Sequence, residues 1–499
     1  MRFLGLFLLG AALLASRAQA GAPERPNIIL VLADDLGLHE LGAYGQEKIR
    51  TPNIDRLARE GMRFTRFYSA STVCAPARAC LMTGLHTGHA PIRGNKEGGG
   101  WGPEEPEGQN PLPAESVTLA ERLKDLGYAT AVFGKWGLGG PGSTGQPNFQ
   151  GFDHFYGYLC QRVAHNYYPT HLWRNHDVDV LHNNDYFRAH QRIEEPLATD
   201  AEYARRYSGG DYAPEEIASE AERWIATHAE QRSGEPFFIY YASIIPHVAL
   251  QAPEAFVDAY PRDWDPGPYL GDRGYLPNPR PRATYAGMIS FLDSVVGRLR
   301  AAVEAAGAGD NTLILITSDN GTTFNGGVDR AFFGSLGDLR GFKTNLYEGG
   351  IRVPMIAWWP GRIAPGTTTD LVAQLPDLHP TVVEAAGGSV PEGLDGLSLL
   401  PTLLRSGEQA THDHLYWEFP EGRQQQAVLL DGRWKAIRPD LRNRGLALEL
   451  YDLATDPGET TDLAGERPAV VERAERVMRE SRIPSGLFPI PALDVLTSE

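Results

Sequence analysis

Three continuous apolar runs in the chain end abruptly in polar or charged residues. They cover residues 26–35, 236–247 and 312–320. A run of this length without polar alternation is typical of a strand that is buried on both faces, as in a parallel sheet. We therefore predict three strands of one buried sheet, each with a polar group at its carboxyl end.

Amphipathic segments alternate with these apolar runs. Helical periodicity extends over residues 51–65, 216–230 and 283–307, and residues 116–140 predict a helix, a strand and a glycine-rich loop. Such alternation of strands and helices predicts a layered α/β fold, with a mixed, mostly parallel sheet flanked by helices.

The pattern changes after about Thr402. Residues 424–439 and 446–459 have the pattern of short strands joined by turns, and residues 468–481 that of a terminal helix. We predict a main domain over residues 21–402. A smaller C-terminal α+β subdomain with an antiparallel sheet is expected over residues 403–499.

The first 20 residues have the pattern of an export signal. Arg2 precedes an apolar run, and Ala18-Gln19-Ala20 resembles a cleavage site. A membrane anchor is the alternative, but the apolar run is short for a span. We expect a signal peptide over residues 1–20 and an exported protein, periplasmic or secreted, without membrane insertion after signal removal.

Composition and charge restrict the partners. The 499 residues carry a net charge of -17, and 42% of them are hydrophobic, which is enough for a sizeable core. No basic stripe is present, so nucleic acid is not expected as a partner. Because an acidic protein repels anions at long range, an anionic substrate needs a local cationic pocket.

The chain contains three cysteines, Cys74, Cys80 and Cys160. An odd number in an exported protein leaves at least one cysteine unpaired. A bridge between Cys80 and Cys160 is an open alternative, although Cys80 fits a small apolar position of a helix. No spacing of cysteine and histidine residues is typical of a zinc site.

Polar side chains follow four of the predicted strands, at the ends where open α/β sheets bind ligands. They are Asp34, Asp35, Lys135, His247, Asp319 and Asn320. Two acidic pairs at one edge repel each other unless a cation lies between them. Their oxygen donors suit Ca²⁺ or Mg²⁺ and not zinc. Helix N-capping is the alternative role for each aspartate.

Cys74 stands at the start of a predicted helix. Pro76 fits the first helical turn, and residues 77–84 continue the helix. The amide groups of a helix N-terminus favour an anion, and Arg78 lies one turn further on. A buried and inert cysteine is the alternative interpretation.

Several blocks of the sequence resemble one family. Residues 74–84, "CAPARACLMTG", resemble the sulfatase signature Cys-x-Pro-x-Arg, and "ADDLG" with "SDNG" resembles the metal-binding pairs of the family. Further blocks follow in the family's order: "TPNIDRLAREGMRFTRFY", "GYATAVFGKWGLG", "GFDHFYGY", "LRGFKTNLYEGGIRVP" and "LYDLATDPGETTDLA". Over most of its length the chain thus resembles the formylglycine-dependent type I sulfatases, which are arylsulfatase-like and have the alkaline-phosphatase-like fold.

The resemblance implies hydrolysis of a sulfate monoester at a metal site. In similar proteins a separate formylglycine-generating or other sulfatase-maturing enzyme oxidises the cysteine, here Cys74, to formylglycine. A hydrated aldehyde oxygen binds Ca²⁺ well and loses its proton more easily beside the cation. The metal ligands of the family match Asp34, Asp35, Asp319 and Asn320, with residue 74 as a further ligand and Ca²⁺ or Mg²⁺ as the ion.

The resemblance also implies the remaining catalytic roles. Arg78 would hold the formylglycine, and Lys135 and Lys343 would bind the sulfate oxygens, where cations stabilise developing charge. His247 would protonate the leaving alcohol.

The chain departs from the family at Gly137, where a histidine is usual. Three explanations are open: another histidine such as His165 fills the space, a water or metal-bound oxygen suffices, or turnover is slow.

Three residues are candidates for binding the alcohol part of a sulfated small molecule or glycan. Arg93, His165 and Glu418 lie in segments rich in arginine, histidine, aromatic and amide groups, which suit sugar rings. A plain loop or core role is the alternative for each. A phosphoester hydrolase of the same superfamily and a non-catalytic sulfoglycan-binding protein are the alternative functions.

Overall fold

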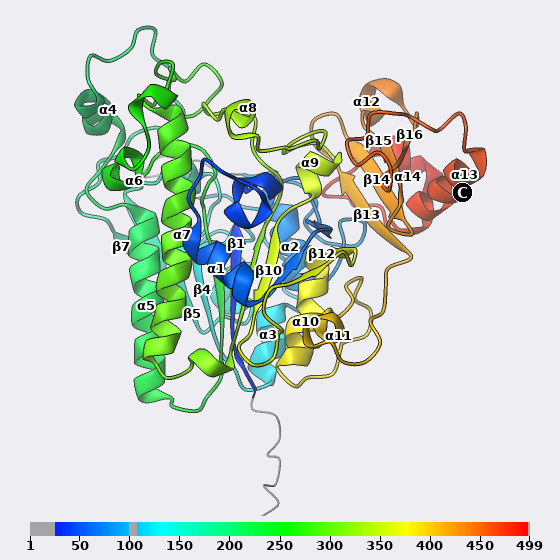
Figure 1. Ribbon diagram of the computed structural model, residues 1–499, viewed down its shortest axis with the longest axis horizontal. Coiled ribbons are helices and arrows are strands. Elements are labelled where there is room, and N and C mark those ends of the chain that lie inside the picture. The colour runs from blue at the N-terminus through cyan, green and yellow to red at the C-terminus, as the bar shows by residue number, and fades with distance from the viewer. Residues whose placement is uncertain (1–24, 99–106, 498–499) are drawn as a thin grey trace, which may run out of the picture.

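The computed structural model describes residues 25–98 and 107–497. The predicted signal peptide lies outside the described residues. A ten-stranded sheet with helices on both faces forms the centre of the molecule, and a smaller four-stranded sheet lies beside it (Figure 1). Within the described part of the chain, no helix is long and apolar enough to cross a membrane.

The large sheet has the strand order β11-β2-β10-β9-β1-β8-β4-β5-β6-β7. Its strands are β1 (Asn27–Ala33), β2 (Met62–Phe64), β4 (Ala129–Lys135), β5 (His154–Tyr158), β6 (His171–Arg174), β7 (Asp177–Val180), β8 (Phe237–Ala242), β9 (Thr312–Ser318), β10 (Met355–Trp358) and β11 (Thr367–Thr369). The central strands β9, β1, β8, β4 and β5 are parallel neighbours, whereas β10, β6 and β7 pair antiparallel. Two short strands, β3 (Phe67–Tyr68) and β12 (Ala373–Gln374), pair separately.

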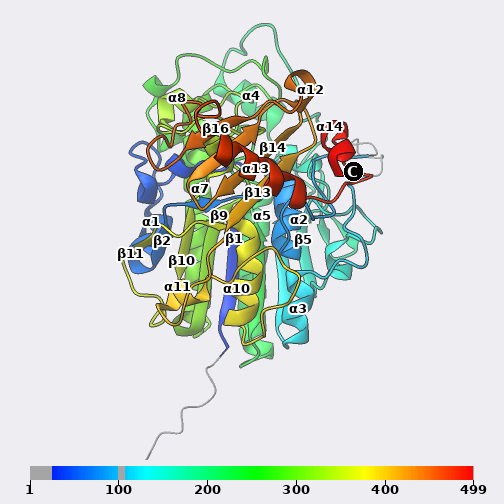
Figure 2. The ribbon, with the colours of Figure 1, turned by 90° about the vertical axis from the view of Figure 1, so that its right-hand side faces the viewer.

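Helices cover both faces of this sheet (Figure 2). The first layer contains α1 (Pro52–Glu60), α5 (Ala213–Gln231) and α7 (Pro281–Ala305), and the second contains α2 (Cys74–Thr83), α3 (Leu119–Asp125) and α10 (Leu378–Ala385). The shorter helices are α4 (Asp200–Tyr207), α6 (Glu254–Asp258), α8 (Arg330–Phe333), α9 (Glu348–Ile351), α11 (Leu400–Leu404), α12 (Leu441–Arg444) and α14 (Pro491–Asp494).

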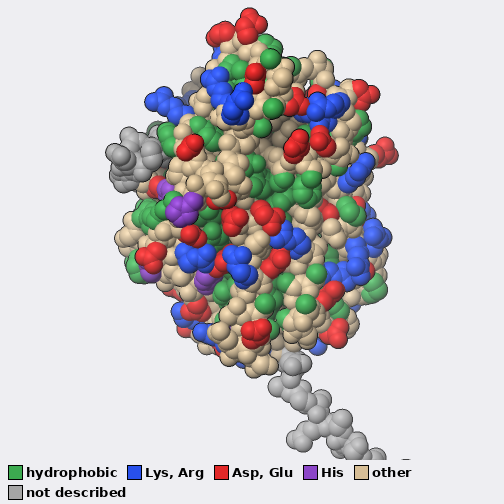
Figure 3. Space-filling model, turned by 90° about the vertical axis from the view of Figure 1, so that its left-hand side faces the viewer, with side chains coloured by type: hydrophobic (Ala, Val, Ile, Leu, Met, Phe, Trp, Pro, Cys, Tyr) green, Lys and Arg blue, Asp and Glu red, His purple; other side chains and the backbone are tan. Residues whose placement is uncertain are grey.

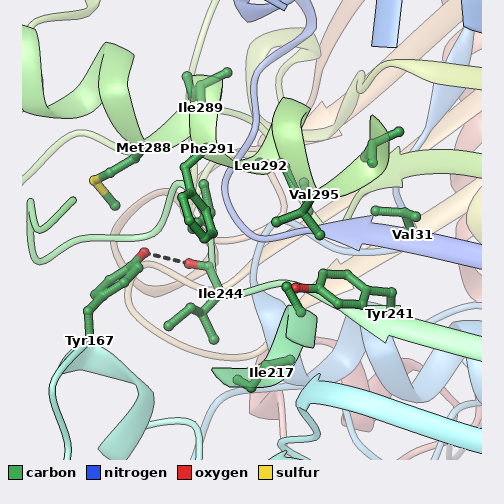
Figure 4. Packing of buried hydrophobic residues seen from close by; sticks show 14 of the residues in the cluster. Val31, Tyr167, Ile217, Tyr241, Ile244, Met288, Ile289, Phe291, Leu292 and Val295 are labelled. Carbon is green, nitrogen blue, oxygen red and sulfur yellow. Dashed lines mark hydrogen bonds between the residues drawn. The ribbon is translucent and has the colours of Figure 1, made fainter. Parts of the chain in front are cut away.

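The side chains of β1 explain why its sequence shows no polar alternation. Ile29 and Val31 pack in the first layer, and Ile28 and Leu30 pack in the second. Figure 4 shows the first layer, which Val31 shares with Val295 of α7. Because both faces of the strand are buried, both sets of side chains are apolar.

The C-terminal part forms an antiparallel sheet of β13 (His414–Phe419), β14 (Gln425–Leu430), β15 (Trp434–Arg438) and β16 (Glu449–Asp452). The helix α13 (Pro468–Glu480) packs on it through Ala474 and Met478. The predicted fold class, an α/β sheet flanked by helices with a smaller antiparallel α+β part, is confirmed.

A buried ion cluster joins the small sheet to the large domain. The Nζ atom of Lys435 on β15 lies 2.9 Å from Oε1 of Glu348 on α9 and 3.1 Å from Oε1 of Glu459. Tyr68 of the large domain donates a hydrogen bond of 2.9 Å to Glu348. Because two buried carboxylates share one cation, each group depends on the others for charge compensation.

The structure corrects one predicted helix and settles the open question of cysteine pairing. The helix predicted over residues 51–65 ends at Glu60, and β2 begins at Met62. The break requires a glycine, because a Cβ at position 61 would lie 2.2 Å from the carbonyl oxygen of Ala357 on the neighbouring strand. The open cysteine pairing is resolved as well, since Cys74, Cys80 and Cys160 are all free and buried.

The surface shows how the acidic charge is distributed. On the face that carries α4 and α5, lysine and arginine side chains are interspersed with acidic ones (Figure 3). Local mixing of the two signs gives no strong attraction for an extended polyanion on this face.

Candidate active site

Two parallel strands bring the predicted acidic pairs to one edge of the sheet. Ala33 at the end of β1 is in register with Ser318 at the end of β9, so the next residues of both strands meet. The backbone amide of Asp35 donates a 3.1 Å hydrogen bond to Oδ1 of Asp319, and Nδ2 of Asn320 donates a 2.7 Å bond to Oδ1 of Asp35. Asp34 and these three residues are fully buried.

The N-terminus of α2 places Cys74 against this edge. Its Sγ atom lies 3.2 Å from Oδ1 of Asp34. Ligand atoms of Asp34, Asp35, Cys74 and His247 all lie within 4.8 Å of one another. Burial, reinforced by Asp34, raises the pKa of the Cys74 thiol well above its usual value, so the unmodified side chain is a neutral thiol. A neutral thiol is a weak nucleophile.

Three cations surround the acidic groups. Lys135 Nζ lies 2.6 Å from Oδ2 of Asp34, and Lys343 Nζ lies 2.8 Å from the Asp35 carboxylate and 3.8 Å from Cys74 Sγ. Arg78 NH2 lies 2.9 Å from Oδ2 of Asp319. Although burial opposes ionisation, Lys135 and its cationic neighbours hold the pKa of Asp34 below its usual range.

The donor set fits a divalent metal ion. Among the described residues, no partner bonds the buried Oδ1 atom of Asn320, whose Nδ2 atom is engaged by Asp35. Burial raises the pKa of Asp319 to about 7, and the negative charge of Asp34 contributes to this rise because like charges repel each other. A hard cation with oxygen ligands would satisfy the free amide oxygen and remove this repulsion.

His247 reaches the site from a loop and not from a strand. The strand predicted over residues 236–247 ends at Ala242, and the hydroxyl of Tyr167 pins the following loop by bonding the carbonyls of Ile244 and His247 at 2.7 and 2.5 Å. His247 Nδ1 lies 2.5 Å from the carbonyl oxygen of Val248, and Nε2 lies 3.8 Å from Oδ2 of Asp35. Burial lowers the pKa of His247 to about 4.

The residue beside Gly137 is one that the sequence did not single out. A Cβ at Gly137 would lie 3.5 Å from Oε1 of Gln161 and 3.9 Å from Cδ of Arg78, and the glycine has a φ of 74°. The ring of His165 instead stacks on His247, with centroids 4.8 Å apart and an angle of 10°. Gln161 therefore takes the space next to Gly137. The sequence signal was its place at the start of residues 161–175, a segment rich in arginine, histidine, aromatic and amide groups.

The predicted substrate-binding residues Arg93 and Glu418 form an ion pair with each other. Arg93 NH1 lies 2.8 Å from Oε1 of Glu418, and Arg482 Nε lies 3.1 Å from its Oε2. Both predicted residues are buried. These bonds tie the loop after α2 to the C-terminal sheet, and a role in binding substrate stays a prediction.

The chain matches family models along most of its length. A model described as "Sulfatase" matches residues 26–389, and one described as "N-sulphoglucosamine sulphohydrolase, C-terminal" matches residues 339–481. The chain is 32% identical to arylsulfatase A of Bos taurus over 510 residues, covering 95% of this chain and 90% of that protein. It is also 32% identical to N-acetylgalactosamine-6-sulfatase of Canis lupus familiaris, covering 86% and 74%.

Solved structures share this fold. The structure of Ps i-CgsB in complex with k-i-k-neocarrahexaose has a TM-score of 0.71 at 26% identity and covers 91% of this chain and 92% of that one. Phosphonate monoester hydrolase of Agrobacterium radiobacter has a TM-score of 0.61 at 23% identity, covering 91% and 95%, and this likeness concerns the fold alone. The chain therefore belongs to the sulfatase family and is an enzyme that hydrolyses sulfate esters.

Proposed function

We propose that the enzyme cleaves a sulfate monoester on a carbohydrate, through a formylglycine made from Cys74 and a bound divalent cation, Ca²⁺ or Mg²⁺. The observation that carries the proposal is the position of Cys74. Its sulfur lies 3.2 Å from Asp34 and 3.8 Å from the ammonium group of Lys343. An oxygen at this position would face both a metal ligand and a cation that can bind sulfate.

The metal would be held by Asp34, Asp35, Asp319 and Asn320, with residue 74 as a further ligand. When bound, the cation and the hydrated aldehyde supply an oxygen nucleophile at neutral pH, because a bound cation lowers the pKa of a coordinated oxygen. The free Oδ1 atom of Asn320 supports this assignment. Conversion of Cys74 requires a separate sulfatase-maturing enzyme as a partner.

The cationic side chains would bind the sulfate group. Lys135 and Lys343 lie on β4 and in the loop before α9, and each contacts one aspartate of the pair that follows β1. Positive charge thus lies beside both aspartates, and the ammonium group of Lys343 also lies 3.8 Å from Sγ of Cys74. Arg78, whose guanidinium group bonds Asp319 and the carbonyl oxygen of Lys135, would fix the orientation of these groups. Fixed cations favour a transition state in which charge develops on the sulfate oxygens.

His247 would supply the proton for the leaving alcohol. Its Nδ1–H group donates to the carbonyl oxygen of Val248, which orients Nε2 toward the acidic edge. An anionic ester bound beside the ring would favour protonation of Nε2. The proton on Nε2 would then pass to the alcohol oxygen as its bond to sulfur breaks.

The proposed carbohydrate substrate has two supports. One similar structure is a complex with k-i-k-neocarrahexaose, and another is a complex with D-glucosamine-2-N,6-O-disulfate, the substrate of that protein. In addition, the net charge of -17 disfavours long polyanions at a distance, so we expect recognition of a local sulfate group. An exported enzyme, periplasmic or secreted, would meet such saccharides outside the cell.

The test is release of sulfate by enzyme co-expressed with a sulfatase-maturing enzyme. Sulfated monosaccharides should be hydrolysed, whereas Cys74→Ala should release no sulfate. Phosphate monoesters, phosphate diesters and phosphonate monoesters should be turned over far more slowly. Faster turnover of a phosphorus ester, or equal activity of Cys74→Ala, would overturn the proposal. Binding of sulfated saccharides without any turnover by the converted protein would favour a non-catalytic role.

A further inference from the structure

Three histidines form a row from the acidic edge to the protein surface. His247 faces Asp35, the ring of His165 stacks on His247, and Nδ1 of His165 lies 3.2 Å from Nε2 of His190. His190 is exposed, whereas His247 is buried. Tyr275 packs edge-on against both His165 and His247, with ring centroids 5.2 and 5.7 Å apart.

Hydrogen bonds determine the tautomers of the two outer histidines. The backbone N–H of Tyr275 donates to Nδ1 of His190 over 3.4 Å. A backbone N–H is only a donor, so Nδ1 of His190 carries no proton and Nε2 does. That Nε2–H group donates to Nδ1 of His165. His165 must then carry its own proton on Nε2. Burial lowers the pKa of both rings, which keeps them neutral.

In this hydrogen-bonded row the Nε2–H donor of His165 has no acceptor among the described residues. Among residues 25–98 and 107–497, no hydrogen bond engages Nε2 of His165. The ring stacks on His247, whose Nε2 lies 3.8 Å from Oδ2 of Asp35, so His165 lies next to the proposed general acid. A donor fixed in direction next to the site of bond cleavage is suited to an oxygen of the substrate.

The backbone of Tyr275 adds a second observation. This residue has a φ of 67°, a left-handed conformation that is strained for a residue with a side chain. The conformation supports the amide that bonds His190 and the ring that contacts His165 and His247. Strained residues of this kind persist where the surrounding structure holds them, and they cluster at ligand-binding sites.

We propose that His165 donates a hydrogen bond from Nε2 to a hydroxyl oxygen of the alcohol part of the substrate, and that His190 is the positioning residue that holds this tautomer. His165, His190 and Tyr275 would then form a subsite for a hydroxyl-rich alcohol such as a sugar, with an aromatic surface and a directed donor. The inference rests on the proposed hydrolysis of carbohydrate sulfates.

Substrate selectivity separates this role from simple packing. His165→Phe keeps the flat ring on His247 but removes the donor, and His190→Phe removes the bonds that fix the tautomer. On galactose 6-sulfate, N-acetylgalactosamine 6-sulfate or N-acetylglucosamine 6-sulfate, whichever is turned over, kcat/KM should fall about tenfold for either variant, as expected for one lost hydrogen bond. On 4-nitrophenyl sulfate, which lacks hydroxyl groups, kcat/KM should fall by a smaller factor, so the ratio of kcat/KM on the sugar ester to that on the aryl ester should fall about fivefold.

A matched control is His176→Phe, because His176 is exposed and packs on Phe149, and it should leave both substrates unaffected. Equal losses on the sugar and aryl esters would overturn the proposal, as would full activity of both His165→Phe and His190→Phe on the sugar ester. Thermal unfolding of each variant identifies a loss that comes from misfolding.

A readout without turnover separates this inference from the proposed function. In Cys74→Ala protein labelled with ¹⁵N-histidine, ¹H–¹⁵N spectra should show His165 and His190 as the Nε2–H tautomer. His165 should lose this single tautomer in Cys74→Ala/His190→Phe. An Nδ1–H tautomer at either residue, or an unchanged His165 spectrum in the double variant, would refute the inference even if sulfate hydrolysis is established.

Discussion

The sulfur atom of Cys74 lies 3.2 Å from a carboxylate oxygen of Asp34, although the two residues are 40 positions apart in the chain. Asp34 follows β1, and Cys74 begins α2, so the contact joins a strand end to a helix N-terminus. Both structural elements direct charged ligands to the same point, since strand ends line the binding edge and helix N-termini favour anions.

Removal of one metal ligand should abolish turnover. Asp319→Ala deletes a carboxylate that bonds the amide of Asp35 and the guanidinium of Arg78. Because the proposed cation supplies several kcal/mol of transition-state stabilisation, we expect kcat/KM to fall about 1000-fold or more. Thermal unfolding should show that Ca²⁺ stabilises the wild type but not the variant. Asp310→Ala, at an exposed position, is the control. Full activity of Asp319→Ala would remove Asp319 from the metal site.

A histidine at position 137 should not improve this enzyme. Gly137 has a φ of 74°, so any other residue costs roughly 1–2 kcal/mol there. An imidazole would also have to displace Gln161, whose Oε1 atom lies 3.5 Å from the Cβ position. We expect Gly137→His to lower kcat/KM about tenfold, the rate equivalent of about 1.4 kcal/mol.

The double variant Gly137→His/Gln161→Gly should recover part of that loss, because the glutamine side chain no longer fills the space. A double-mutant cycle measures the interaction between the two positions. It requires steady-state kinetics and thermal unfolding of Gly137→His, Gln161→Gly and the double variant. If Gly137→His alone were as active and as stable as the wild type, Gln161 would not occupy the space that we assign to it.

The buried cluster between the two sheets should be essential for stability. Lys435→Met leaves Glu348 and Glu459 buried without their shared cation, so we expect a loss of about 3–5 kcal/mol in the free energy of unfolding. The variant Lys435→Met/Glu348→Gln/Glu459→Gln removes the charges together and should recover much of the loss. Denaturant unfolding measures both. Arg473→Met, which removes an exposed ion pair with Asp431, should change little, and an equally small effect of Lys435→Met would show that the buried cluster is not essential for stability.

The same cluster predicts how stability depends on pH. Burial raises the pKa of Glu459 from its usual value of 4.5 to about 7. Between these two values the folded protein binds more protons than the unfolded chain, so the contribution of Glu459 to stability falls as pH rises. Glu459→Gln cannot titrate. The melting temperature of the wild type minus that of the variant should therefore decrease from pH 4.5 to 7.

Glu466→Gln, at an exposed position, is the matched control for this titration and should run parallel to the wild type. A difference between the wild type and Glu459→Gln that stays constant or grows with pH would show that Glu459 does not titrate as we describe.

Much of the scaffold could be predicted because double burial leaves a strong sequence signal. The runs that contain β1, β8 and β9 are apolar on both faces, and parallel strands end at a common edge. From these two facts alone, Asp34, Asp35, Asp319 and Asn320 are expected close together, and the structure brings them together. The end of the helix at Glu60 was missed because residues 62–64 form a strand by pairing with β10, which lies far along the chain.

The residues around the edge could not be predicted, because loops carry no periodicity. Gln161 and His190 are assigned to the site only by distances to Gly137 and His165. The charge cluster of Lys435 and Glu348 joins positions 87 residues apart, and the sequence does not indicate which buried charges will meet. Such pairings depend on how the two sheets pack against each other, which local patterns do not determine.

The central claim is that position 74 carries an oxygen group at a divalent metal site. Mass spectrometry of the peptide that contains Cys74, from enzyme co-expressed with a functional sulfatase-maturing enzyme, tests it most directly. We expect the mass of an aldehyde in place of the thiol, in a fraction of molecules that rises in proportion to kcat for sulfate release. Full sulfatase activity in protein whose Cys74 peptide retains an unmodified thiol would contradict the claim.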